Sequence, residues 1–221
     1  MKEAVKSILN DSVNAQIDFE TVDLSLLSSF PQANVTVGNL KIVNQKPFKG
    51  DTLCTVHSIS FDLPIKELFK NESDGPLVIN SIEIDEAVLS IKSDEFGNTN
   101  YDILKEPEDV STVNDRNFKL NIEDYAIRNS AVTYIDETSN TLVNITKLNH
   151  SGKGNFSSDF SDLQTKTEAR VSFSVDSIHY LNATSIKLDA LIDLDLNENK
   201  YTFKDNKALI NKLPLEFNGF V

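Results

Sequence analysis

The chain has 221 residues, of which 39% are hydrophobic, and its formal net charge at pH 7 is −13. This composition is typical of a folded protein with room for one large β domain or two small ones. The acidity argues against a nucleic-acid partner, because phosphate binding needs clustered Lys and Arg. The single cysteine, Cys54, excludes an internal disulfide, and no nucleophile signature surrounds it.

The first third of the chain is predicted to form one short helix and several strands. Residues 2–13 place Val5, Ile8 and Leu9 on one helical face. Alternation of apolar and polar residues then predicts strands, because successive side chains on a strand point to opposite faces. The predicted strands cover residues 15–23, 34–43 and 52–63, and a second short helix covers residues 65–70 after Pro64.

Two segments in the middle of the chain each resemble a strand, a tight turn and a second strand. Residues 81–91 have apolar alternation on both sides of a short polar break. Residues 120–135 show a related arrangement, with the turn at Asn129-Ser130, and residues 35–43 give a weaker third example. The pattern predicts successive β-hairpin-like units that are added to one sheet.

The clearest alternation lies near the C-terminal end, in residues 184–196. Its apolar residues share one parity, and Lys187, Asp189, Asp193 and Asp195 share the other. Residues 106–117 are polar and are expected to be a linker or loop. We therefore divide the chain into an N-terminal β-groove region with capping helices (1–105), this linker (106–117) and a continuation of the same sheet (118–221).

The expected fold is mainly β: an elongated, strongly curved antiparallel sheet, shaped as an open groove or gutter, with one or two short helices at the N-terminal end. Such a sheet has to cover its apolar side, either with a packed core or with a bound apolar ligand. Both interpretations are open at this point. The residues expected to face the apolar side are Ile82, Ile84, Leu89, Ile91, Ile186, Leu188, Ile192 and Leu194.

Candidate catalytic and metal-binding patterns are weak throughout the chain. His57, His150 and His179 are far apart and have unrelated neighbours, so they offer no ligand or nucleophile–base spacing. Residues 94–102 are rich in oxygen ligands, although a turn around Gly97 is the simpler interpretation. We expect no catalytic residues, no metal site and no cofactor, and therefore a protein that is not an enzyme.

One further segment resembles the start of a calcium-binding loop. Asp193, Asp195 and Asn197 have the spacing of the first three ligands in such a loop. However, Glu198 stands where the loop has a glycine, and Lys204 stands where it has its bidentate glutamate. We interpret both aspartates as the polar face of a strand.

Several exact strings, taken in their order, resemble the N-terminal region of the AsmA family of Gram-negative bacteria. The resemblance covers roughly residues 12–105. The strings are Asp23-Leu24-Ser25-Leu26 with Phe30-Pro31, Phe48-Lys49-Gly50-Asp51-Thr52-Leu53, and Ile79-Asn80-Ser81-Ile82 with Gly97-Asn98-Thr99-Asn100-Tyr101-Asp102-Ile103-Leu104.

The resemblance implies a bridge-like lipid-transfer protein of the periplasm. Such proteins are anchored in the inner membrane by one N-terminal helix and carry phospholipid acyl chains in an apolar β groove. The chain lacks that anchor helix and is shorter than typical members, so it is expected to be a soluble piece of a longer protein. Envelope protein partners and a role in outer-membrane lipid homeostasis are further implications.

The function expected from the sequence is thus non-enzymatic binding or conduction of phospholipid or other acyl-chain lipids. An extracellular β-sandwich module for binding or adhesion is the alternative. That module would have a closed core and would use loops such as residues 106–117 for recognition. An open groove along the strands would favour lipid binding, and two packed sheets would favour the module.

Overall fold

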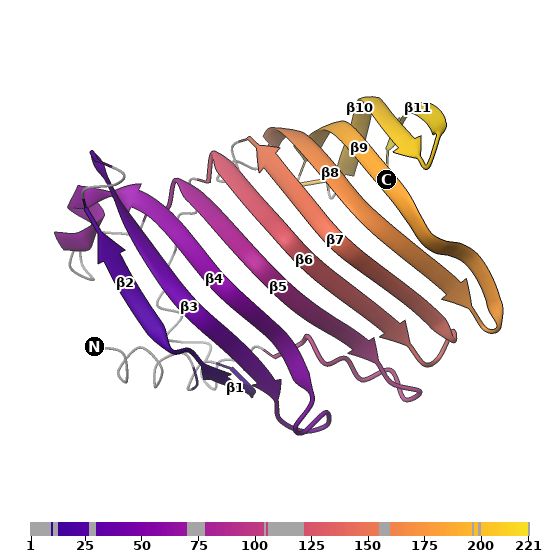
Figure 1. Ribbon diagram of the computed structural model, residues 1–221, viewed down its shortest axis with the longest axis horizontal. Helices are drawn as coiled ribbons and strands as arrows, with labels where there is room; N and C mark the ends of the chain where they lie inside the picture. Colours follow the sequence, from indigo (N-terminus) through magenta and orange to yellow (C-terminus); the bar gives the residue numbers. More distant parts are fainter. Residues whose placement is uncertain are drawn as a thin grey trace.

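The computed structural model describes residues 10, 13–26, 30–69, 78–103, 105, 122–154, 160–195, 197–198 and 200–220. These residues form one open sheet of 11 strands, shown in Figure 1. The strands are β1 (Ala15–Asp18), β2 (Thr21–Ser25), β3 (Gln32–Asn44), β4 (Thr52–Pro64), β5 (Ser81–Ser93), β6 (Asp124–Asp136), β7 (Thr141–Lys153), β8 (Phe160–Val175), β9 (Ile178–Asp195), β10 (Lys200–Ile210) and β11 (Leu213–Phe220).

The order of the strands in the sheet follows their order in the chain. From β3 onward each strand pairs with the next, and β1 and β2 both pair with β3 at the N-terminal edge. All of these pairs are antiparallel except β5–β6, which is parallel. The mainly β, mostly antiparallel and open fold predicted from the sequence is therefore confirmed.

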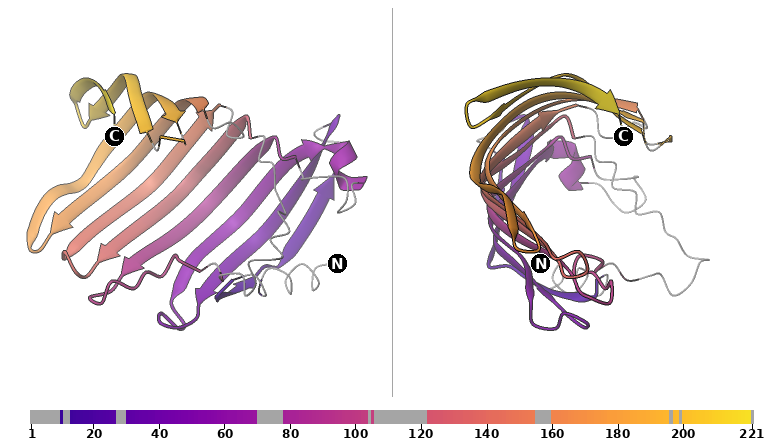
Figure 2. Two further views of the ribbon diagram at one scale, coloured as in Figure 1. Left: turned by 180° about the vertical axis from the view of Figure 1, so that it is seen from behind. Right: turned by 90° about the vertical axis from the view of Figure 1, so that its right-hand side faces the viewer.

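The sheet is strongly curved. Viewed along its long axis, it has the outline of an open letter C, and the strands run around the curve (Figure 2). We call the concave side the trough. The short 3-10 helix η1 (Ile65–Phe69) follows β4, contacts β3 and β4, and lies inside the curve at one end (Figure 2). It confirms the short helix predicted after Pro64, whereas the helix predicted at residues 2–13 falls almost entirely outside the described residues.

One left-handed residue lies within each of six strands and changes which face the following side chains occupy. The change is clearest in β7, where Val143 and Ile145 are half-buried before Lys147, and Leu148 and His150 are half-buried after it. The side chains that follow such a residue occupy the opposite face. At Lys147, Ala183 and Asp205 the register of a ladder also shifts, as at a β-bulge, whereas both ladders of β5 keep their register across Glu86. The left-handed residues are Asn39, Glu86, Asn129, Lys147, Ala183 and Asp205.

The hairpin-like units expected from the sequence are wrong. Residues 81–91 belong to one continuous strand, β5, in which Glu86 has a φ of 51°. Likewise, Asn129 lies inside β6 with a φ of 49° and not in a turn between two strands. A reversed alternation looks the same in sequence whether a tight turn or one left-handed residue causes it, and these breaks are left-handed residues within continuous strands.

Short turns join the last strands. The chain turns between β8 and β9 at Asp176-Ser177, and Asn182 lies inside β9 beside the bulge at Ala183. A turn at Asn211-Lys212 joins β10 and β11. The linker predicted at residues 106–117 lies outside the described residues. The strands before and after it, β5 and β6, pair directly with each other.

The sheet is not a sandwich. The described strands all belong to one sheet, so the closed β-sandwich considered as an alternative does not describe this architecture. Fully buried apolar side chains are concentrated at the N-terminal part of the sheet. They include Val13, Ala15 and Phe19 around β1, and Phe48 and Leu53 around the β3–β4 hairpin.

Candidate functional site

Mainly apolar side chains form rows across the strands. Residues that pair across a ladder place their side chains on the same face of the sheet, so the rows can be followed from strand to strand. One row runs from Ile59 on β4 to Leu188 on β9, and its members are Ile59, Ile84, Ile127, His150, Thr167 and Leu188. A second contains Phe61, Ile82, Tyr125, Gly152, Thr165 and Ala190.

The reversed alternation beyond the left-handed residues keeps two further rows on the same side. The first of these contains Cys54, Leu89, Val132, Ile145, Val171 and Thr184. The other contains Ile91, Tyr134, Val143, Phe173 and Leu181. We call the surface made by these four rows the apolar face.

The apolar face lines the trough. The paired residues Ala33 and Leu63 continue the alternation of Val35 and Phe61 and are only 0% and 4% exposed where β3 and β4 meet η1. Because η1 lies inside the curve, this side of the sheet is the concave one. Side chains on a concave surface converge, which explains why Leu89 is half-buried while its neighbour Val88, on the convex side, is 54% exposed.

The eight residues predicted to face the apolar side lie on β5 and β9. Ile82, Ile84, Leu89, Ile91 and Leu188 belong to the four rows above. Each of the remaining three pairs with apolar or small residues of neighbouring strands: Ile186 with Ala169 and Ile210, Ile192 with Leu163 and Phe203, and Leu194 with Ser161 and Tyr201. All eight are half-buried, and none is fully covered by the described part of the chain.

The convex side of the sheet is charged. Along β8 the exposed residues Lys166, Glu168 and Arg170 alternate with less exposed ones. Cross-strand ion pairs join Glu168 to Lys187 at 2.7 Å and Arg128 to Glu83. Exposed pairs of this kind contribute little stability, but the charges keep this side of a wide sheet solvated.

One polar cluster interrupts the apolar face. The Tyr125 hydroxyl lies 2.7 Å from Nε2 of His150, and Nδ1 of His150 lies 2.9 Å from the Thr167 hydroxyl. Burial lowers the pKa of His150 and raises the pKa of Tyr125, because both charged forms lose solvation. These residues come from β6, β7 and β8, and no sequence motif connects them.

Gly152 gives Tyr125 the space to reach His150. A Cβ at position 152 would lie 2.3 Å from the nearest atom of the Tyr125 ring, so any side chain there would displace the ring. The ring therefore lies over the glycine and extends across β7. The two aromatic rings are tilted by 45° with their centroids 5.3 Å apart.

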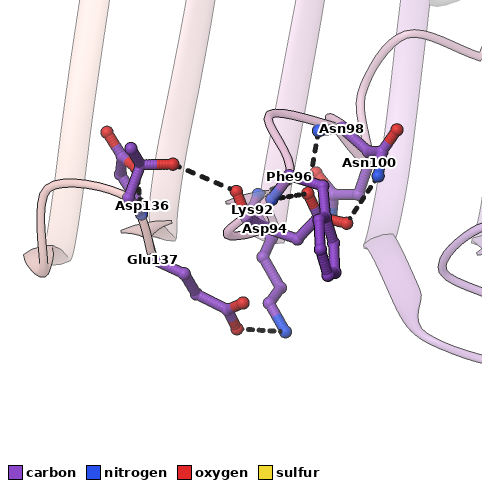
Figure 3. Close-up of polar contacts among 8 residues, drawn as sticks. Lys92, Asp94, Phe96, Asn98, Asn100, Asp136 and Glu137 are labelled. Carbon is purple, nitrogen blue, oxygen red and sulfur yellow. Dashed lines mark hydrogen bonds and ion pairs between the residues drawn. The ribbon is translucent and has the colours of Figure 1, made fainter.

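A polar loop closes the end of β5 at the rim of the trough (Figure 3). The Asp94 carboxylate accepts hydrogen bonds from the amides of Phe96 and Asn98 and from the Asn98 side chain, and these bonds lower its pKa. Gly97 has a φ of 82°, which confirms the predicted turn. Lys92 pairs with Glu137 of the β6–β7 turn at 2.8 Å.

The acidic segments considered as calcium loops are used in other contacts. Asp193 pairs with Lys204, and Asp195 accepts hydrogen bonds from the amides of Asn197 and Glu198. Within the described parts of the chain, no three His, Cys, Asp or Glu side chains gather as metal ligands. Cys54 is half-buried on the apolar face, and burial raises the pKa of its thiol.

Comparison with models of known families, with curated proteins and with solved structures gives no match to this chain. The helical residues that the structure describes include no stretch of the length and hydrophobicity needed to cross a bilayer. The site is therefore defined by its own geometry, which is a wide concave surface of half-buried aliphatic and aromatic side chains with one polar cluster.

Proposed function

We propose that the protein binds the acyl chains of phospholipids or other lipids along the trough and catalyses no reaction. The observation that carries this proposal is the apolar face itself, which continues across the strands without a second layer of described residues over it. A sheet normally buries such a face against another element. Each methylene group that leaves water for an apolar surface contributes about 0.8 kcal/mol.

The chemistry of the face fits acyl chains better than ligands with many polar groups. Its rows are mainly Val, Ile, Leu and aromatic residues, which provide area without fixing a specific hydrogen-bonding pattern. The extent of the face from β4 to β9, with its one polar cluster, supports an extended ligand, or several ligands side by side, over a compact one. The charged convex side, by contrast, offers no comparable apolar area.

The resemblance to the AsmA family extends this proposal to the cell envelope. On that basis the protein acts in the periplasm as part of an inner-membrane-anchored protein, contributes to outer-membrane lipid homeostasis and works with other envelope proteins. The open, curved sheet supports this proposal, because the groove attributed to that family needs such a shape. The cellular location and the envelope partners can be tested separately from lipid binding itself.

Lipid binding is tested by native mass spectrometry and lipid extraction after purification without detergent. We expect co-purified acyl-chain lipid with the native sequence and a strong reduction with Leu89→Asp, which puts a charge on the apolar face. Val88→Asp is the matched control, because it places the same charge on the convex side of the same strand. Circular dichroism establishes that both variants keep their β structure.

Two outcomes would contradict the proposal. The first is a native protein that carries no lipid and takes up no added fluorescent acyl-chain probe. The second is equal lipid in folded Leu89→Asp and Val88→Asp, which would show that binding does not involve the apolar face. If Leu89→Asp does not fold, Leu188→Asn provides a milder change in the same face.

A further inference from the structure

The cluster of Tyr125, His150 and Thr167 is the feature of the apolar face that a purely apolar ligand does not explain. His150 on β7 pairs with Ile127 on β6 and with Thr167 on β8. Beyond these neighbours the same row continues with Ile84 on β5 and Leu188 on β9. Placing imidazole and phenol groups in such a surface has a solvation cost unless they are hydrogen-bonded. Their mutual hydrogen bonds satisfy them in the unliganded protein.

The hydrogen bonds available to the cluster depend on the protonation state of His150. A neutral imidazole donates through one nitrogen and accepts through the other, so one of the two hydroxyls must donate to it. A protonated imidazole donates through both nitrogens, to the Tyr125 and Thr167 oxygens. His150 then needs neither hydroxyl hydrogen, and both hydroxyls lie next to a positive charge, which is an arrangement suited to an anion.

No other charge faces His150 from the neighbouring strands, within the described residues. On its own side of the sheet, β6 contributes Tyr125 and Ile127, and β8 contributes Thr165, Thr167 and Ala169. The nearby charged residues Arg128, Lys166 and Glu168 are exposed on the convex side. Protonation of His150 is therefore opposed by desolvation, and the field of a bound anion would favour it.

We propose that Tyr125, His150 and Thr167 form an anchor for the anionic headgroup of a single-chain lipid whose acyl chain lies on the apolar face. Binding of the headgroup is accompanied by uptake of one proton on His150, so the affinity for anionic lipids increases as the pH falls. The inference rests on the proposed acyl-chain binding. It adds a headgroup preference and a defined position for the head of the ligand.

The test compares two probes of equal chain length. Hexadecanesulfonate stays anionic between pH 8 and pH 5, and hexadecanol stays neutral, so a difference in pH dependence between them originates in the protein. Binding is measured by displacement of a fluorescent acyl-chain probe at concentrations below micelle formation. We expect the affinity for the sulfonate, relative to the alcohol, to rise about tenfold as one proton is taken up over this range.

Variants assign the effect to the cluster. His150→Gln should remove the pH dependence and retain binding of hexadecanol, whereas the matched change His179→Gln, at an exposed position on β9, should leave both unchanged. Tyr125→Phe and Thr167→Val each remove one hydroxyl and preserve shape, and each should weaken only sulfonate binding at low pH. In an NMR titration, the pKa of His150 should rise with the sulfonate and stay unchanged with the alcohol.

The possible failures can be told apart. If both probes bind with the same pH profile, or if folded His150→Gln keeps the preference for the sulfonate, the anchor is wrong while acyl-chain binding stands. If neither probe binds to the native protein, the proposed function fails and the anchor fails with it.

Discussion

Individual side chains stabilise the bulges by bonding to backbone groups that the irregular ladder leaves without a strand partner. The Ser130 hydroxyl accepts a hydrogen bond from the Ala87 amide and donates one to the Arg128 carbonyl, and Ser130 is only 2% exposed. Asn206, with 0% exposure, accepts from the Leu191 amide in the same way. Buried backbone groups are costly if unpaired, so these small polar residues are part of the architecture.

The substitution Ser130→Ala is expected to lower the free energy of unfolding by about 1–3 kcal/mol, because it leaves the Ala87 amide without its acceptor. Urea denaturation followed by circular dichroism measures the change. Ser151→Ala, at an exposed position on β7, is the control and should change the stability by less than about 0.5 kcal/mol. Equal effects of the two substitutions would contradict a structural role of the Ser130 hydroxyl.

His150 should make the stability of the ligand-free protein depend on pH. Burial lowers its pKa in the folded state below the ordinary value of about 6.5, so the unfolded chain binds the proton more tightly. This contribution to stability is therefore present at pH 8 and is lost as the pH falls below about 6.5. Urea denaturation between pH 8 and pH 5 should show a weaker decline for His150→Gln than for the native protein or His179→Gln. An identical decline in all three would argue against this assignment.

The loop after β5 shows how an irregular element is fixed to the sheet. The Asn100 side chain accepts a hydrogen bond from the Lys92 amide and donates one to the Ser90 carbonyl, both at 2.7 Å. The backbone carbonyl of Asn100 accepts a hydrogen bond from the side chain of the buried Asn44. Asn100 therefore pairs with β5 beyond the last β4–β5 pair, Cys54 with Leu89, and connects the loop with the end of β3.

We expect Asn100→Ala to destabilise the protein by about 2–3 kcal/mol, because it removes the partners of two half-buried backbone groups of β5, the Lys92 amide and the Ser90 carbonyl. Asn98→Ala in the same loop is the comparison, since Asn98 is exposed and bonds to Asp94 at the end of the loop (Figure 3). Thermal and urea unfolding measure both variants. The interpretation would be contradicted if the loss at position 98 equalled the loss at position 100.

At the scale of elements, alternation in the sequence predicted most strands, because an exposed convex side and an apolar concave side require it. Residues 184–196 are the clearest example and lie almost entirely in β9. Glu86 and Asn129 were misread because the sign of φ leaves no reliable mark on a polar residue within a strand. The Tyr125–His150–Thr167 cluster could not be predicted, since its members are 25 and 17 residues apart and meet only through strand register.

The whole molecule is an array in which each strand from β3 to β11 contacts mainly its immediate neighbours. Few contacts therefore connect distant parts of the sheet, in contrast to a closed sandwich or barrel. Stability in such an array approaches a sum of local terms and interfaces between neighbours, as in repeat proteins. The strand at the C-terminal edge, β11, is exposed along its whole length.

Removal of residues 213–221 is therefore expected to leave β3 to β9 folded. Hydrogen exchange measured by mass spectrometry should show unchanged protection in β6 and β7 and reduced protection only in β10, which loses a pairing partner. Substitution of Asn206 by alanine in the full-length chain provides a comparison, because it disturbs the β9–β10 ladder from within. Loss of protection throughout the sheet on truncation would show a single cooperative unit instead.

The curved strands separate two dimensions of the molecule. The width of the trough depends on how many residues each strand spends going around the curve, which is 13 in each of β3 to β7. Its length depends on how many strands stand side by side, because each neighbour adds about 4.8 Å. Under the proposed function, duplication of a strand pair would therefore lengthen the trough for more lipid at constant width, whereas longer strands would widen it for bulkier lipids.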